Sequence, residues 1–569
     1  MEFQKTESQS LRTKGAIKDF FATVIKSLFL VLSYILVSLG QPAWMPVCGP
    51  IAAALGYALF WMFLDSNVSK AKRLYFSFFW FFSVQLIQLS WLTSIKYQGL
   101  YILAVYLLLC GLMGFQFAFL TRVLFSRNSL KISTAVSVAA LGILLEWSRL
   151  FIFCGFSFNF SGMALTCYLP SMQFASVFGI LGLSFLFLLA NALAFRAYKN
   201  SFHWKAIGCW AVVVIFPYVF GLANIRYNNG SESASSPLKV LLVQTALAPS
   251  EKFPLHRFPH EFISPYEQWR QIFSFVYPYN EKGADLVILP ESVVPFGVDL
   301  PVYSLANIEL VAKSLHLDLK PFYPPLEAPF AEFKNDLWLV SNAFWAQTLA
   351  NFTGSEVIAG FDHHDKITKE NFNAAFCFKP NAKLFDRYEK QVLLPLAEVL
   401  PWEFLKIFTK SYGITEFFTP GKHSKLFSEK WKAGVSICIE ETIPEIMRDS
   451  HNKGAKLFVN VSNDGWYPNS KLTSQHYSHS RVRAVENGIP LVRACNTGVT
   501  GVVDANGSLL CSIQSESYSR SAEKGIVYKS FELRSIPTLY SFWGDAGIVT
   551  LCLVFLVWIY RPRDEGIVL

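Results

Sequence analysis

The stretch KAGVSICIEETIPE, residues 432–445, decides how the α/β part of this chain folds. A short run rich in Val and Ile ends at Cys438, and two carboxylates, Glu440 and Glu441, follow at once. Such a run is typical of a strand that is buried on both faces. Free cysteine is usually buried and inert, so Cys438 is either a small core residue or a nucleophile at a strand end.

The composition of the whole chain is that of a membrane protein. Of its 569 residues, 52% are hydrophobic and 16% are charged, and the mean hydropathy is +0.33. Soluble proteins carry roughly a quarter charged residues. The net charge of +9 is modest and no dense basic run is interleaved with aromatics, so nucleic-acid binding is not indicated. The ten cysteines form no C-x-x-C pair, which argues against a zinc ribbon, a redox pair or a disulfide framework.

Apolar segments of about 20 residues, the length that crosses a bilayer, predict eight membrane spans. They lie near residues 20–40, 47–65, 74–94, 100–121, 134–153, 172–195, 205–223 and 543–560. Glu146 and Arg149 interrupt the fifth span. Ionisable groups inside a span are usually paired or functional. We expect these two to pair, and to position the large segment outside the membrane or a lipid headgroup.

Basic residues predict the orientation of these spans, because Lys and Arg favour the cytoplasmic side. They gather on alternate connections, namely the N-terminal tail, residues 70–73, 122–131 and 196–205, and the C-terminal tail with Arg561 and Arg563. This pattern predicts a multi-pass protein of a bacterial inner (cytoplasmic) membrane with both termini in the cytoplasm. The large segment before the last span then lies on the periplasmic side.

Three parts follow from this layout. Residues 1–227 form a transmembrane bundle with seven of the spans, and residues 228–542 form a periplasmic domain that begins with the turn-rich linker NNGSESASSP at 228–237. Residues 543–569 hold the last transmembrane helix and a cytoplasmic tail. The first apolar run also resembles a signal peptide, with SLG before Gln41 as a cleavage site, but the second span follows too closely for that interpretation.

The periplasmic segment has the pattern of a layered α/β domain. Short apolar runs, read as strands, lie at 239–245, 284–292, 355–361, 374–378, 433–440, 455–463, 490–497 and 500–507. Helix-like stretches such as 441–453 and 472–488 lie between them. Strands that alternate with helices predict α/β layers, while the short hairpins near the end argue against a simple doubly wound sheet.

Polar side chains follow several of these strands. Glu291, Cys438 and Asn463 with Asp464 each close an apolar run, and Lys390 stands in RYEKQVLLPLAE. Catalytic groups gather at strand ends in open α/β sheets. A cysteine nucleophile needs a base to take its proton, and a nearby ammonium stabilises the oxyanion of an attacked carbonyl group. Glu291, Lys390 and Cys438 have the chemistry for these three roles.

The motifs LPES (289–292), YEKQVLLPLAE (388–398), CIE (438–440), NVSNDGWY (460–467) and RACNTG (493–498) occur in this order. Together they resemble the nitrilase superfamily with its Glu–Lys–Cys triad. With eight spans and an outward-facing domain, the chain resembles the membrane-embedded branch of that superfamily, the apolipoprotein N-acyltransferase family. The resemblance covers nearly the whole chain. It implies an αββα sandwich attached to a helical membrane bundle, and an enzyme without a cofactor or a metal.

The resemblance also implies a role for each matched residue. Glu291 matches the general base, Lys390 the lysine that stabilises the oxyanion, and Cys438 the nucleophile. Glu398 and Glu440 match two supporting carboxylates. The implied reaction moves a fatty acyl chain from a phospholipid to Cys438 as a thioester. The free amine of a diacylglyceryl-cysteine at the N-terminus of an apolipoprotein then takes the acyl group as an amide.

The chain departs from the family pattern at four places. PLAE (395–398) replaces P-F-G-E, Ile439 replaces an aromatic residue between Cys and Glu, and Phe253 replaces a tryptophan after lysine. The stretch 297–350 is longer than the family pattern predicts. These changes leave the triad in place, so we expect them to affect the preference for acceptor or lipid rather than the chemistry.

Other motifs have a simpler explanation. The adjacent histidines of DHHD (362–365) point to opposite faces of a strand, which argues against a metal site. His476 and His479 are spaced for one helix face but lack a third ligand, so a structural role is favoured. Cys495 has no paired acid and is interpreted as a core residue.

Two other functions remain open at the level of sequence. The first is a membrane-tethered amidase of the same fold, which hydrolyses amides. The second is a transporter or sensor with an extracellular binding domain. A transporter is expected to carry polar groups and broken helices in several spans, whereas here Glu146 and Arg149 form the one such cluster and the reactive groups lie outside the membrane.

Overall fold

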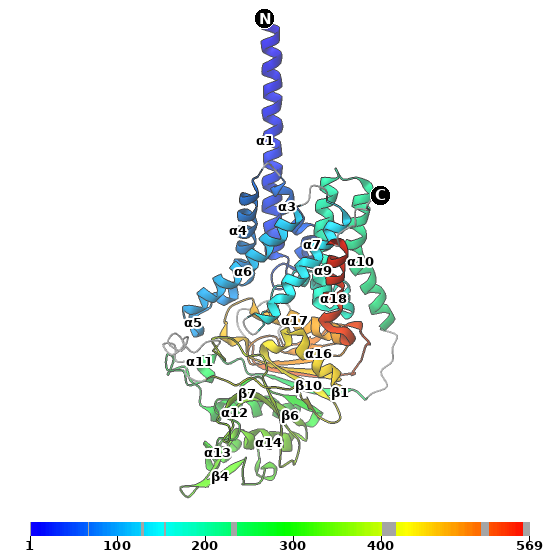
Figure 1. Cartoon of the computed structure of the whole chain (residues 1–569). Coiled ribbons are helices and arrows are strands. Elements are labelled where there is room, and N and C mark those ends of the chain that lie inside the picture. Colours follow the sequence, from blue (N-terminus) through cyan, green and yellow to red (C-terminus); the bar gives the residue numbers. More distant parts are fainter. Residues whose placement is uncertain are drawn as a thin grey trace.

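The computed structural model describes residues 2–65, 68–126, 130–152, 155–228, 236–400, 417–513 and 523–560. It has a helical bundle at one end and an α/β domain at the other (Figure 1). The helix α1 (Glu2–Leu39) extends beyond the bundle on the side away from the α/β domain. Most of the predicted linker, Arg127, and the tail with Arg561 and Arg563 lie outside the described residues.

Within those ranges, six helices are long and apolar enough to cross a membrane: Pro46–Leu64, Tyr101–Leu124, Ile132–Phe151, Ala175–Lys199, Trp204–Asn228 and Leu539–Tyr560. The other two predicted spans are also helical. The α1 helix contains the shorter apolar stretch Thr23–Leu39, and three of the first four residues of α4 (Lys70–Gln88) are basic. All eight predicted segments are therefore helices, while the number that cross the membrane stays a prediction.

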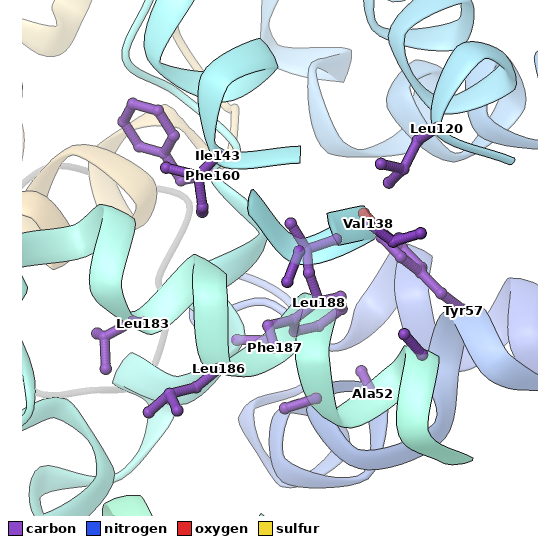
Figure 2. Close-up of a cluster of buried hydrophobic side chains, with 14 of the residues drawn as sticks. Ala52, Tyr57, Leu120, Val138, Ile143, Phe160, Leu183, Leu186, Phe187 and Leu188 are labelled. Atoms are coloured by element: carbon purple, nitrogen blue, oxygen red, sulfur yellow. The ribbon is translucent and has the colours of Figure 1, made fainter. Parts of the chain in front are cut away.

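The core of the bundle is built around α9 (Ala175–Lys199). Figure 2 shows side chains of α9, such as Phe187 and Leu188, beside Val138 of α7 (Ile132–Ser148) and Tyr57 of α3 (Tyr57–Leu64). These side chains are buried, as are those of α6 (Tyr101–Leu124) that face them. The helices α10 (Trp204–Asn228) and α18 (Leu539–Tyr560) pack on α9 from outside and leave many apolar side chains exposed, as expected of a surface that faces lipid.

One buried polar residue holds an irregular turn in this core. The π-helical turn Ala52–Gly56 precedes α3, and such turns leave backbone groups without regular partners. Asn191 of α9 supplies them: its Oδ1 accepts from the backbone N–H of Tyr57 at 2.8 Å and of Ala58 at 3.1 Å, and its Nδ2 donates to the carbonyl of Ala53 at 2.8 Å. The turn is therefore fully compatible with an apolar environment.

The α/β domain holds two six-stranded sheets. The first sheet has the order β15 (Gly525–Phe531), β1 (Leu238–Gln244), β2 (Leu286–Ile288), β6 (Glu356–His364), β7 (Asn371–Phe378), β8 (Asp386–Glu389). The second has the order β14 (Leu509–Ser512), β13 (Gly501–Val503), β12 (Leu491–Cys495), β11 (Leu457–Ser462), β10 (Ala433–Ile437), β9 (Leu426–Phe427). All eight predicted strands are present. Each sheet has three parallel strands at its centre and antiparallel strands at its edges.

Alternating residues along these strands create three apolar layers. Val240 and Leu242 of β1 face Val435 and Val459 of the second sheet, in the layer between the sheets. The side chains that alternate with them along each strand point to the opposite face of their sheet and pack against helices. The first sheet is covered by α12 (Pro265–Val276) and α14 (Asn342–Thr353), and the second by α16 (Pro444–Asn452) and α17 (Leu472–Asn487). The predicted αββα sandwich is confirmed, and the hairpins at the end of the chain form the edge of the second sheet.

The long stretch 297–350 adds a small layer to the first sheet. It contains α13 (Leu305–Ser314) and a three-stranded sheet of β3 (Tyr303–Ser304), β5 (Leu337–Val340) and β4 (Ala331–Lys334). This addition lies at the end of the domain that is farthest from the bundle (Figure 1). It therefore does not line the surface where the domain meets the helices.

Candidate active site

The three predicted catalytic residues follow three strand ends. Glu291 comes three residues after β2, Lys390 directly follows β8, and Cys438 directly follows β10. The first two strands belong to the first sheet and β10 belongs to the second. All three side chains are buried, with exposed fractions of 6%, 1% and 8%. The site therefore lies where the ends of the two sheets meet, out of contact with bulk water.

Lys390 joins two carboxylates at the centre of this site. Its Nζ lies 2.8 Å from Glu398 Oε1 and 3.2 Å from Glu291 Oε1. Asn373 bridges the same two oxygens, because its Nδ2 donates to Glu291 at 2.8 Å and to Glu398 at 2.9 Å. Burial lowers the pKa of Lys390, but the attraction of both carboxylates outweighs burial and keeps its pKa well above the usual range. Lys390 is therefore a fixed ammonium.

Cys438 is the first residue of a short 3-10 helix, η9 (Cys438–Thr442), and its φ is +51°. A non-glycine residue adopts this left-handed conformation when its surroundings hold it there. Burial raises the pKa of the thiol well above its ordinary value, Glu291 raises the pKa further, and Lys390 lowers it. The thiol is thus protonated at rest and close to both partners, so it needs a base before it can attack.

Glu440 ties the strand that ends at Cys438 to the loop that carries Lys390. Its carboxylate accepts from the backbone N–H of Ile437 at 2.7 Å and of Gln391 at 2.5 Å, and from the Tyr388 hydroxyl at 2.9 Å. Burial raises the pKa of Glu440 to about 7, against the effect of these donors. Glu440 therefore acts on the relative position of the two sheets and has no contact with a reacting atom.

Two functional neighbours escaped the sequence analysis. Asn373 is the third residue of β7, and Lys252 ends the short helix α11 (Pro249–Lys252), where the departure at Phe253 drew attention instead. Lys252 is fully buried, and its Nζ donates to the backbone carbonyl of Glu291 at 3.0 Å. Burial lowers the pKa of Lys252 to about 7, although Glu291 and Asp362 raise it. The sequence offered no signal for Lys252, because its burial becomes visible in the folded chain, where lysine is almost never fully buried without a partner.

The short helix that begins at Cys438 contacts the chain segment that follows the bundle helix α7. Ser157 follows α7, and its hydroxyl lies 2.5 Å from the hydroxyl of Thr442, which ends the helix η9. Glu146 orders this connection, since its carboxylate accepts from the backbone N–H of Ser161 at 3.0 Å. The predicted pairing of Glu146 with Arg149 is confirmed, at 3.6 Å. This pair is thus one hydrogen-bonded loop away from the short helix that begins at Cys438.

Aromatic rings from both parts of the protein meet beside the site. Trp91, which follows α4, packs edge to face on Tyr467 at 5.0 Å, and Phe253 stacks on Trp466 at 5.9 Å. Both Trp466 and Tyr467 belong to the loop after β11. The phenylalanine that departs from the family pattern thus keeps an aromatic contact at this position.

The histidines of DHHD and the second strand-end cysteine, Cys495, have ordinary contacts. His363 and His364 lie at the end of β6, and their contacts are with Asp299 and Asn371 respectively. Cys495 is fully buried at the end of β12, as predicted for a core residue. In the described part of the chain, no group of three or more His, Cys, Asp or Glu is arranged to hold a metal ion. His476 has a different environment, which is described below.

Comparisons with known proteins match both parts of the chain. Residues 33–193 match the family profile described as "Apolipoprotein N-acyltransferase N-terminal domain", and residues 264–521 match the profile "Carbon-nitrogen hydrolase". Proteins named apolipoprotein N-acyltransferase from Chlamydia caviae and Chlamydia trachomatis are both 29% identical to this chain. The first alignment covers 93% of this chain and 96% of the relative, and the second covers 94% and 98%.

A more distant relative also aligns with most of the chain, and a solved structure aligns with about half of it. The protein of that name from Haemophilus influenzae is 27% identical, over 87% of this chain and 88% of the relative. Among solved structures, Nit3 of Saccharomyces cerevisiae, a member of branch 10 of the nitrilase superfamily, is 20% identical with a TM-score of 0.35 and covers 55% of this chain and 95% of its own. The tandem profile matches and the full-length relatives agree with the motifs and with the αββα fold. The chain belongs to the apolipoprotein N-acyltransferase family, the membrane-embedded branch of the nitrilase superfamily.

Proposed function

We propose that this protein is a membrane-bound acyltransferase that N-acylates apolipoproteins, with a phospholipid as acyl donor and Cys438 as the nucleophile. The observation that carries the proposal is the meeting of Glu291, Lys390 and Cys438 in one buried site beside a membrane bundle. Both substrates have fatty chains that stay in the bilayer. A hydrolase-like domain therefore needs a bundle that holds its site at the membrane surface.

The first half-reaction forms the thioester. Glu291 takes the thiol proton of Cys438, and the thiolate attacks the ester carbonyl carbon of the phospholipid. Lys390 stabilises the oxyanion that develops on the carbonyl oxygen. The C–O bond to the glycerol then breaks, Glu291 returns the proton to the leaving alkoxide, and a lysophospholipid departs. Acyl transfer in two steps replaces one difficult step with two easier ones.

The second half-reaction uses the same groups. The free α-amine of a diacylglyceryl-cysteine attacks the thioester carbonyl carbon, and Lys390 again stabilises the oxyanion. The C–S bond breaks, an amide forms, and the proton lost by the amine passes through Glu291 to the Cys438 thiolate. Burial of Cys438 favours this amine over water as acceptor, because excluded water cannot hydrolyse the thioester. Glu398 and Glu440 support the site by holding Lys390 and the strand end.

The arrangement of basic residues supports a periplasmic location of the α/β domain. Lys199 at the end of α9 pairs with Asp65 at 3.0 Å, and the Arg73 guanidinium lies 4.1 Å from the centre of the Phe125 ring. The opposite end of α9 contacts α17 of the α/β domain, so the basic end of the bundle faces away from that domain. Basic ends favour the cytoplasm. In cells with a permeabilised outer membrane, Lys383→Cys should react with an impermeant maleimide and Lys72→Cys should not.

Intact-protein mass spectrometry tests the function. Detergent-purified wild type is incubated with phospholipid and no acceptor, beside Cys438→Ala and the control Cys495→Ala, another buried cysteine at a strand end. We expect a fatty-acyl mass on wild type and Cys495→Ala that hydroxylamine removes, and no such mass on Cys438→Ala. Failure of wild type to gain it would exclude phospholipid as donor and favour the membrane-tethered amidase, which small amides would then test.

A further inference from the structure

The backbone carbonyl of Cys438 is held by two buried side chains that the mechanism above does not use. Asn460 of β11 donates to this oxygen through Nδ2 at 3.1 Å, and His476 of α17 places Nε2 at 3.2 Å from it. Asn460 is fully buried and His476 is 2% exposed. Both contacts come from the side of the second sheet that α16 and α17 cover.

The imidazole of His476 is itself fixed by charged groups. Its Nδ1 lies 2.8 Å from Asp464 Oδ1 and 2.8 Å from the Arg493 guanidinium, and its Nε2 lies 3.1 Å from Glu441 Oε1. Arg493 also bonds to Glu441 at 2.8 Å and to Asp464 at 3.3 Å. Both partners of Nε2, the carbonyl of Cys438 and the carboxylate of Glu441, are acceptors. Nε2 therefore carries a proton and donates it, whichever state Nδ1 has.

This anchor fixes a peptide group at the reacting centre. The C=O of Cys438 and the N–H of Ile439 belong to one planar trans peptide, so they point in opposite directions. The carbonyl points toward α17, on the outer side of the second sheet. The N–H of Ile439 therefore points toward the first sheet, from which Lys390 approaches. The left-handed φ of Cys438, +51°, is the conformation that this contact holds in place.

We propose that His476, together with Asn460, is a positioning residue for acyl transfer at Cys438. Its Nε2–H holds the Cys438 carbonyl, so that the thiol and the Ile439 N–H face the acyl carbon and its oxyanion, opposite Lys390. The proposal rests on the proposed function, since it adds a positioning residue to the same reaction. It replaces the structural role that the sequence favoured for His476.

Two substitutions separate positioning from simple packing. His476→Gln places an amide near the position of Nε2, within reach of the carbonyl. His476→Asn places its amide near Nδ1, where Asp464 and Arg493 remain in reach but the carbonyl does not. His479→Asn is the matched control, because His479 lies one turn later on α17, is equally buried, and has no hydrogen bond to Cys438 in the described part of the chain.

Each variant is measured by two reactions of the same thiol. Acylation by phospholipid, and by the activated ester p-nitrophenyl butyrate, passes through an oxyanion. Alkylation of Cys438 by iodoacetamide, followed by peptide mass spectrometry, does not. We expect His476→Asn to slow acylation roughly 10- to 100-fold, less than the roughly 10²- to 10³-fold loss for a removed oxyanion donor because here the donor is displaced and not removed, and to leave alkylation within about twofold of wild type. His476→Gln should recover most of the loss, and His479→Asn should match wild type in both reactions.

Several results would overturn the proposal. Equal losses of acylation and alkylation in His476→Asn would mean that the site has simply come apart. Acylation unchanged in His476→Asn, or equally slow in the Gln and Asn variants, would remove the specific role of Nε2. If His476→Asn does not fold, Asn460→Leu tests the other donor. Acylation should again be slower and alkylation unchanged. Wild type that reacts with the activated ester but not with phospholipid would contradict the proposed donor and leave the role of His476 measurable.

Discussion

Lys390 Nζ lies 2.8 Å from Glu398 Oε1, closer than its 3.2 Å distance to the matched general base, Glu291. The ammonium is thus shared between two carboxylates: Glu398 is the nearer one, while Glu291 makes the larger electrostatic contribution to the raised pKa of Lys390. Glu398 is held in turn by the backbone N–H of Leu394 at 2.8 Å and by Asn373. The supporting glutamate therefore regulates how strongly Lys390 binds the base.

This sharing predicts the effect of Glu398→Gln. With one charge removed, Lys390 is expected to bind Glu291 more tightly, which makes Glu291 a poorer proton acceptor and draws the ammonium away from the oxyanion. We expect kcat to fall roughly 10²- to 10³-fold, the loss typical of a displaced oxyanion donor. Single-turnover acylation of Cys438 measures the effect. Glu445→Gln, an exposed carboxylate in a surface pair with Arg448, is the control, and similar losses in both variants would contradict the specific role.

The buried Glu440 predicts a pH-dependent contribution to stability. Burial raises the pKa of Glu440 from 4.5 to about 7, so between these values the folded state binds more protons than the unfolded state. The derivative of the unfolding free energy with pH is then negative. The stabilising contribution is present below the unfolded pKa and is lost as pH rises through about 7. Thermal unfolding in detergent should show the Tm of wild type falling relative to Glu440→Gln between about pH 5 and about pH 8.

The opposite sign is expected for Lys252. Burial lowers the pKa of Lys252 from 10.5 to about 7, so above that pH the unfolded state binds more protons and stability rises with pH. The Tm of wild type should therefore rise relative to Lys252→Met between about pH 7 and about pH 9. The substitution Lys252→Met should also lower the activity. Loss of the bond to the Glu291 carbonyl is expected to lower kcat roughly tenfold through a misplaced base, and an unchanged kcat would exclude this positioning.

A glycine in α9 makes the close packing of α9 against α18 possible. Gly179 has φ +65° at a kink, where a Cβ atom would lie 2.4 Å from Tyr540 Cε2 of α18. Gly179→Ala should destabilise the protein by about 2–5 kcal/mol, the sum of a strained backbone and an overpacked contact. Gly208→Ala in α10 is the control, because nothing lies within 4 Å of its Cβ position. We expect it to stay within about 1 kcal/mol of wild type, as read from detergent melting curves.

Local patterns predicted most of the elements. The runs at 239–245 and 455–463 became β1 and β11, because Val- and Ile-rich stretches of that length bury both faces in a parallel sheet. Strand ends also located Glu291 and Cys438, since such ends meet at a common edge. Glu291 and Cys438 lie far apart in the sequence, but each could be predicted separately because each follows a strand of its own.

The same patterns did not show that the strands divide into two sheets, or which buried polar groups meet. Asn373 and Glu398 are 25 residues apart and share a direct hydrogen bond, and His476 meets the Cys438 carbonyl across 38 residues. The spacing of His476 and His479 favoured a structural role, and their separate partners became visible in the folded chain.

The sequence by itself determined the helices of the bundle, the strands, and the three residues that follow strand ends, because hydrophobic period and length are properties of short segments. Tertiary structure decided the rest. It paired Lys390 with two carboxylates, gave Lys252 a carbonyl to bind, and placed His476 against the backbone carbonyl of Cys438. The physical reason is that a buried polar group is stable when its partners reach it, and those partners come from strands and helices that lie far apart along the chain.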